Sequence, residues 1–273
     1  MHRPLLVLML AGAFLVAGCT TRPSTGPGDD AQTSAPTQID YALGECQASI
    51  VLFLVPPEHA QDRLPPGYTY RDASTISPLP LDEGNALVAL AAFKCAEATW
   101  GHGPLDWGFL GILIEAPDRS DIAPEPVAFE LYLLEYYTDN AQQLAGLDAM
   151  HFAATQASMM FAAPSPAGPF SLEATDSDGH LFSLQTVPVP AEKPVTPGMR
   201  HWHAHDDGVL VWNYAFEATE RVGRTIDCTL RPGAGPADAT GRVDCFGTTP
   251  PTLLEASLGG EASVRFLPNA SAP

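Results

Sequence analysis

The chain has 273 residues, with 32 Asp and Glu against 13 Lys and Arg and a formal net charge of −19. So acidic a surface repels nucleic-acid phosphates and anionic lipid headgroups, which weighs against a nucleic-acid partner and against membrane binding through a basic patch. The length accommodates one domain or two small ones.

The N-terminus has the parts of a secretory leader. Arg3 precedes an apolar run over residues 5–18 that is too short to cross a bilayer as a helix, and small residues precede Cys19. The letters LVAGC ending at Cys19 resemble a bacterial lipobox, which implies that Cys19 becomes the first mature residue and carries an acyl chain such as palmitate. We therefore expect a lipoprotein of the cell envelope. It would be bound to the bilayer through Cys19, at the outer membrane and facing the periplasm or the cell surface.

A polar segment follows the leader. Residues 20–38 are mainly Thr, Pro, Ser, Gly and Asp, and such a composition cannot bury enough apolar surface to fold. The sequence therefore predicts a leader at 1–18, a lipidated flexible linker at 19–40 and a single β-rich domain at 41–273.

Most of the predicted elements in that domain are strands. Runs rich in apolar, aromatic and branched residues predict buried central strands at 48–55, 86–96, 109–114 and 127–137. Farther along, the turn residues at 176–179 and the Asp207-Gly208 pair each separate two shorter strand-like segments, which predicts two hairpins.

Helical segments are few. Residues 58–64 and 140–150 are the candidates, and Asp139 is placed to cap the second. Roughly ten strands with one or two short helices indicate an α+β fold of mostly antiparallel strands, arranged as a cone-like or barrel-like sheet.

The cysteines favour disulfides. With Cys19 assigned to the lipid, an even set remains in an exported chain, and no CxxC pair indicates a metal site. Of the three possible pairings we favour Cys228 with Cys245, because they face each other across a predicted hairpin, which leaves Cys46 with Cys95. Free buried thiols are the alternative.

Three motifs occur in a recognisable order. PEHAQDRLPPGY at 57–68 precedes GNALVALAAF at 84–93, and GHGPLDWG at 101–108 follows. This order resembles the acetoacetate decarboxylase superfamily, in which a short helix ending in Leu-Pro-Pro-Gly precedes a long strand and a Gly-Pro turn leads to the next. The resemblance implies a double-layered, cone-like β barrel around an apolar cavity. It also implies a Schiff-base lysine after the helix that follows the middle strands.

The chain departs from the family where that lysine is expected. Segment 151–157 has none, and Lys94 and Lys193 are the lysines of the whole chain. An imine-forming amine must be deprotonated, and no other side chain replaces it. Lys94 is the better candidate because it interrupts an apolar strand. The alternative for Lys94 is a strand-end residue whose ammonium reaches water or pairs with Glu97.

His201, His203 and His205 alternate along a predicted strand, so their imidazoles point to the same face. With Asp206 as orienter or fourth ligand they could hold zinc or copper. The alternative is a set of solvent-facing or cavity-lining histidines, hydrogen-bonded to the backbone and to Asp206 or Asp207.

Other catalytic motifs, such as G-x-S-x-G, H-E-x-x-H and phosphate-binding glycine loops, are absent from the sequence. We therefore predict no cofactor and expect a lipid-anchored, non-catalytic domain whose cavity binds a small apolar or aromatic ligand. Two alternatives stay open. One is a metal-binding protein or metal-dependent enzyme using His201, His203 and His205. The other is a decarboxylase-like Schiff-base enzyme using Lys94.

Overall fold

The computed structural model describes residues 38–75, 84–100, 103–118, 129–162, 170–195, 198–230 and 252–268. The predicted leader, Cys19 and Cys245 lie outside these ranges. The first strand begins at Gln38, so its first residues belong to the range 19–40 that was assigned to the linker.

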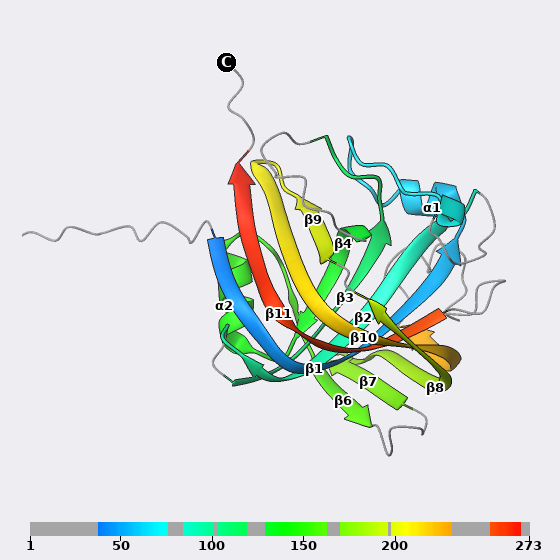
Figure 1. The fold of residues 1–273 in the computed structure, drawn as a ribbon. Coiled ribbons are helices and arrows are strands. Elements are labelled where there is room, and N and C mark those ends of the chain that lie inside the picture. The colour runs from blue at the N-terminus through cyan, green and yellow to red at the C-terminus, as the bar shows by residue number, and fades with distance from the viewer. Residues whose placement is uncertain are drawn as a thin grey trace, which may run out of the picture. The chain divides into compact units, whose positions relative to one another are not determined.

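Within the described ranges, an 11-stranded sheet forms the body of the domain (Figure 1). The strands are β1 (Gln38–Val55), β2 (Ala86–Ala98), β3 (Gly103–Leu113), β4 (Phe129–Thr138), β5 (Thr155–Gln156), β6 (Ser158–Ala162), β7 (Phe170–Asp176), β8 (Gly179–Val195), β9 (Gly198–Ala204), β10 (Gly208–Leu230) and β11 (Thr252–Pro268). Two short helices, α1 (Pro57–Gln61) and α2 (Ala141–Ala149), and a 3-10 turn at Ala73–Thr75 accompany them. The predicted α+β class is confirmed.

Part of the sheet closes on itself. The strands follow one another in the order β11-β1-β2-β3-β4-β9-β10, and β10 pairs again with β11, which completes a ring. These neighbours are antiparallel except β4 and β9, which run parallel. Strand β10 is long enough to leave the ring: its first half pairs with β9, and its second half pairs with β8, which continues into β7 and β6.

The ring has two apolar faces because successive side chains of a strand point to opposite sides. On β2, Phe93 belongs to one core cluster and Leu90 to another. The first cluster is the interior of the ring, since Trp107 of β3 stacks on Tyr214 of β10 although these strands are not neighbours in the sheet. The second cluster lies on the outer face, where side chains from β6, β7 and β8 cover it.

Helix α2 begins one residue later than the sequence predicted. Asn140, and not Asp139, is the N-cap, and its Oδ1 accepts hydrogen bonds of 3.0 Å from the backbone N–H groups of Gln142 and Gln143. Asp139 is still held by the strand pairing, because its N–H donates to the carbonyl of Asp106 on β3.

Both predicted hairpins are present. Between β7 and β8, the N–H of Asp178 donates to Asp176 Oδ1 at 2.8 Å, and Gly179 takes the positive φ of 109° that the turn requires. Between β9 and β10, the N–H of His205 donates to the carbonyl of Gly208 at 2.7 Å. The turn residues therefore predicted the strand ends correctly.

A disulfide joins Cys46 of β1 to Cys95 of β2, as predicted. The two residues are register partners and both are buried in the interior of the ring. Cys228 lies in β10, and its pairing with Cys245 falls outside the described residues and stays a prediction.

Replacing both Cys46 and Cys95 by alanine should lower the free energy of unfolding by about 2 to 4 kcal/mol. The bond closes a loop with a sequence separation of 49, and opening that loop frees the unfolded chain. Urea denaturation measures the loss. Reducing the wild-type chain before unfolding is the control and should give at least this loss, because a reductant also opens the predicted bond between Cys228 and Cys245. Equal midpoints for variant and oxidised wild type would contradict this role.

None of the helices in the described ranges is both long and apolar enough to cross a membrane.

Candidate binding site

The interior of the ring is lined by stacked aromatic side chains. The Trp107 ring on β3 lies 3.9 Å from the Phe93 ring, 5.3 Å from Tyr214 and 5.7 Å from Tyr136, measured between centroids. Trp212 of β10 continues this arrangement at 6.1 Å from Tyr136. Such a lining offers a large apolar area with polar atoms only at the ring edges.

Helix α2 brings a polar side chain into this lining. The helix packs against the ring near the start of β1, where a Cβ added at Gly146 would come within 2.9 Å of the Trp100 ring (Figure 1). The Asn140 cap fixes the first turn, and Gln143 in that turn is fully buried. Its Nε2 donates a hydrogen bond of 2.9 Å to the hydroxyl of Tyr136.

Three buried tyrosine hydroxyls lie close to one another. The hydroxyl of Tyr214 interacts with those of Tyr41 and Tyr136, which come from β10, β1 and β4. Burial is the main cause that raises the pKa of each of the three above its usual value. The hydroxyls therefore keep their protons at physiological pH and can donate hydrogen bonds.

His201 of β9 completes the lining. Its ring lies 4.3 Å from the Phe109 ring and 4.9 Å from the Tyr214 ring, and the side chain is fully buried. Burial lowers the pKa of His201 to about 3, so the imidazole is neutral at physiological pH. A neutral imidazole has one N–H donor and one acceptor nitrogen.

Several of these buried polar atoms have no hydrogen-bond partner among the described residues. They are Trp107 Nε1, Trp212 Nε1, Gln143 Oε1 and both ring nitrogens of His201, and we call these four residues the inner polar set. Each unsatisfied buried group costs about 1 to 3 kcal/mol, so together they would cost as much as the whole stability of an ordinary domain. A partner from outside the chain, either water or a bound molecule, removes that cost.

His201 and His203 of β9 both contact rings of the inner core cluster, and His205 follows the end of the strand. Nδ1 of His203 lies 2.9 Å from the carbonyl oxygen of Leu133, and its ring lies 5.0 Å from that of His205. Asp206 is exposed in the turn. Over the described part of the chain, no group of three or more His, Cys, Asp and Glu is arranged to hold a metal ion. The metal site considered from the sequence at His201, His203 and His205 gains no support from this arrangement and stays a prediction.

Lys94 lies on the outer face of the ring. It alternates with Phe93 and Cys95, which point inward, and its side chain is exposed. The ammonium lies 5.8 Å from the centroid of the Phe161 ring, and Asp106 is its register partner on β3. Burial raises the pKa of Asp106 to about 6, although the charge of Lys94 opposes this rise. Lys94 thus points away from the inner polar set.

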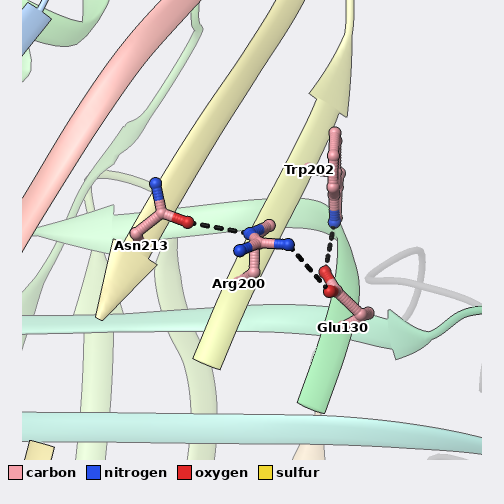
Figure 2. A network of polar contacts seen from close by, with 4 residues as sticks. All are labelled: Glu130, Arg200, Trp202 and Asn213. Atoms are coloured by element: carbon pink, nitrogen blue, oxygen red, sulfur yellow. Dashed lines mark hydrogen bonds and ion pairs between the residues drawn. The ribbon is translucent and has the colours of Figure 1, made fainter. Parts of the chain in front are cut away.

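A buried polar network holds β9 in place from the outer side (Figure 2). Arg200 pairs with Glu130 of β4 at 3.1 Å and donates to Oδ1 of Asn213 on β10 at 2.8 Å. Trp202 donates to the second oxygen of Glu130 at 2.6 Å. Burial is the main cause that raises the pKa of Glu130. Since these contacts connect β4, β9 and β10, they fix the register that turns His201 and His203 inward.

Sequence reasoning did not identify the inner polar set apart from His201, nor the Arg200 network. The sequence places Trp107 in the Gly-Pro turn before a strand, Trp212 within a strand and Gln143 in a helix, and none of these placements indicates a site. An available signal was the arginine that interrupts an otherwise apolar and aromatic strand at position 200. No local pattern indicated Gln143.

No family model and no curated protein matches this chain. Its fold, however, is similar to that of solved structures. One is the enduracididine biosynthesis enzyme MppR complexed with the condensation product of pyruvate and imidazole 4-carboxaldehyde, with a TM-score of 0.58 and 15% identity over 89% of this chain and 94% of that one. Another is an acetoacetate decarboxylase-like enzyme from Sphingomonas wittichii RW1, with a TM-score of 0.54 and 11% identity over 85% and 92%.

A third similar structure is the acetoacetate decarboxylase of Legionella pneumophila, with a TM-score of 0.56 and 10% identity over 90% of this chain and 93% of that one. The acetoacetate decarboxylase-like fold implied by the sequence motifs is therefore confirmed. At these identities the likeness concerns the fold, and activity depends on the residues of the site.

Proposed function

We propose that this domain binds a small molecule inside its ring, reversibly and without forming an imine. The observation that carries the proposal is the inner polar set, whose buried atoms lack partners within an aromatic lining. A bound molecule with a planar apolar part and a few polar atoms would satisfy both features at once.

The position of Lys94 supports binding over Schiff-base chemistry. An amine that attacks a carbonyl must lie beside the bound substrate and be deprotonated, which requires a desolvated lysine or a second cation nearby. Lys94 is exposed on the outer face, and Lys193, the other lysine of the chain, lies in β8 outside the ring. No described residue supplies an amine to the inner polar set.

The similar structures support a small-molecule ligand. MppR was solved with a condensation product of pyruvate and an aromatic aldehyde, so in that protein the same fold accommodates a small molecule of this kind. Here the tryptophan and tyrosine rings of the interior provide a comparable surface for a planar group.

Calorimetric titration of the purified full-length chain with benzaldehyde tests the proposal. We expect saturable binding, and after sodium borohydride treatment we expect no more mass increment than the urea-unfolded chain shows. The control variant Lys94→Gln should bind benzaldehyde as the wild type does. A stoichiometric reduced adduct on Lys94 would contradict reversible binding, and the absence of any saturable heat would contradict binding in the ring.

We also propose that the domain is anchored to the cell envelope through a lipid on Cys19. The support is the short apolar run and the small residues that precede this cysteine. Labelled palmitate should enter the chain in a bacterial host, and the substitution Cys19→Ser should abolish the label. Equal labelling of both chains would overturn the anchor.

A further inference from the structure

A second property of the interior concerns charge. Every described side chain that is buried on the inner face is apolar, aromatic or a neutral polar group, as the membership of the inner core cluster and the lowered pKa of His201 indicate. Among the described residues the buried Arg or Lys side chain is that of Arg200, which points to the outer side of β9 and contacts Glu130 and Asn213. None of the described side chains buried in the interior therefore carries a charge that could pair with a bound ion.

Hydrogen-bond donors outnumber acceptors in the inner polar set. The indole nitrogens of Trp107 and Trp212 can only donate, and the neutral His201 adds one N–H group, which makes three donors. On the acceptor side the set has Gln143 Oε1 and one nitrogen of the neutral His201. A complementary ligand must therefore bring acceptor atoms for the two indoles, and it can use a donor or two of its own.

The free-energy cost of burying a charge should make the ring bind a neutral carbonyl compound more tightly than a carboxylate of the same shape. A carboxylate offers the same acceptor oxygens as a carbonyl, but it loses its hydration on entering the ring and finds no cation there. A neutral carbonyl group loses far less on the same transfer, and the indole N–H groups of Trp107 and Trp212 compensate for that loss.

Building on the proposed function, we infer that the ring selects uncharged, planar, carbonyl-bearing molecules and rejects the carboxylates of the same size. Primary amides and aromatic ketones belong to the accepted class, and the matching acids to the rejected class. An amide is especially suited, because its NH₂ group pairs with Gln143 Oε1 or with His201 while its carbonyl accepts from an indole.

Benzamide and benzoate form a matched pair that tests the inference, since they have nearly the same shape and differ in charge near neutral pH. Calorimetric titration of the full-length chain at about pH 7.5 should give a Kd for benzamide at least about tenfold below that for benzoate. The ratio is measured on the wild-type chain and does not depend on whether a variant folds.

Two substitutions locate the donors. Trp107→Phe and Trp212→Phe each remove an indole N–H and should weaken benzamide binding about three- to tenfold. Tyr70→Phe is the control, because Tyr70 packs against the core cluster on the outer face of the ring, and it should leave the Kd unchanged. Equal weakening by all three substitutions would overturn the assignment of the donors.

The outcomes separate the two proposals. Benzoate binding as tightly as benzamide, or more tightly, would overturn the selection by charge while leaving binding in the ring intact. If neither benzamide nor benzoate binds, and benzaldehyde also gives no saturable heat of binding, the proposed function and this inference are both overturned.

Discussion

Replacing His201 by phenylalanine should make the domain much more resistant to acid. The pKa of His201 is about 3 in the folded chain, against 6.5 for an ordinary histidine. Between these values the unfolded chain binds a proton that the folded chain does not, so stability falls as the pH drops from about 6.5 to about 3. The total loss is about 5 kcal/mol at 1.36 kcal/mol for each pKa unit, and the phenylalanine variant should not show it.

Chemical denaturation of wild type and His201→Phe at several pH values between 7.5 and 3.5 measures the difference. At pH 7.5 the variant should be at least as stable as the wild type, because the substitution removes two unpartnered nitrogens from the interior. The control is His180→Phe, at an exposed position, which should keep the wild-type pH dependence. Parallel curves for wild type and His201→Phe would show that His201 is not buried and neutral.

The substitution Arg200→Met should destabilise the domain by about 3 to 5 kcal/mol. It removes the cation that pairs with Glu130 at 3.1 Å and leaves that carboxylate in a largely buried position. Truncating one partner of a buried ion pair is costly because the other charge stays desolvated and unpaired. Thermal and chemical unfolding at neutral pH should both report the loss.

A double-mutant cycle provides the control for this prediction. In the variant carrying both Arg200→Met and Glu130→Gln the carboxylate is gone, so part of the lost stability should return. Losses below about 1 kcal/mol for the single substitution, or strict additivity of the two, would contradict an energetic coupling between β4 and β9 through this pair.

Most of the fold could be predicted because strand patterns and turn residues are local signals. The run from Ala86 to Ala96 predicted β2 to within two residues, and Asp207-Gly208 predicted the β9–β10 turn. The capping residue was placed one position too early, since Asp139 remains bonded to β3 and only Asn140 is free to cap. Long-range strand pairing decides such ends, and the local sequence does not contain it.

The faces of the strands were only half predictable. A period of two indicates which residues share a face, and it correctly grouped Lys94 with Leu90 and His201 with His203. Which of the two faces is the interior depends on how the ring closes through β10 and β11. The sequence could therefore not decide that Lys94 points outward while His201 points inward.

The inner polar set was the least predictable part. The set is defined by buried polar atoms that lack hydrogen-bond partners. Such a lack can be recognised only when all the neighbours of an atom in the folded chain are known. Trp107, Gln143 and Trp212 come from β3, α2 and β10, so no spacing in the sequence connects them. The fold shared with acetoacetate decarboxylase-like enzymes positions these elements, and the residues on them give this ring its own chemistry.

A crystal structure of the chain grown with benzamide, at a resolution that shows ordered water, tests the central claim most directly. We expect non-protein density inside the ring, within hydrogen-bond distance of Trp107 Nε1 or Trp212 Nε1 and beside His201. An interior in which these nitrogens bond to the chain's own side chains, with no guest or water next to them, would contradict it.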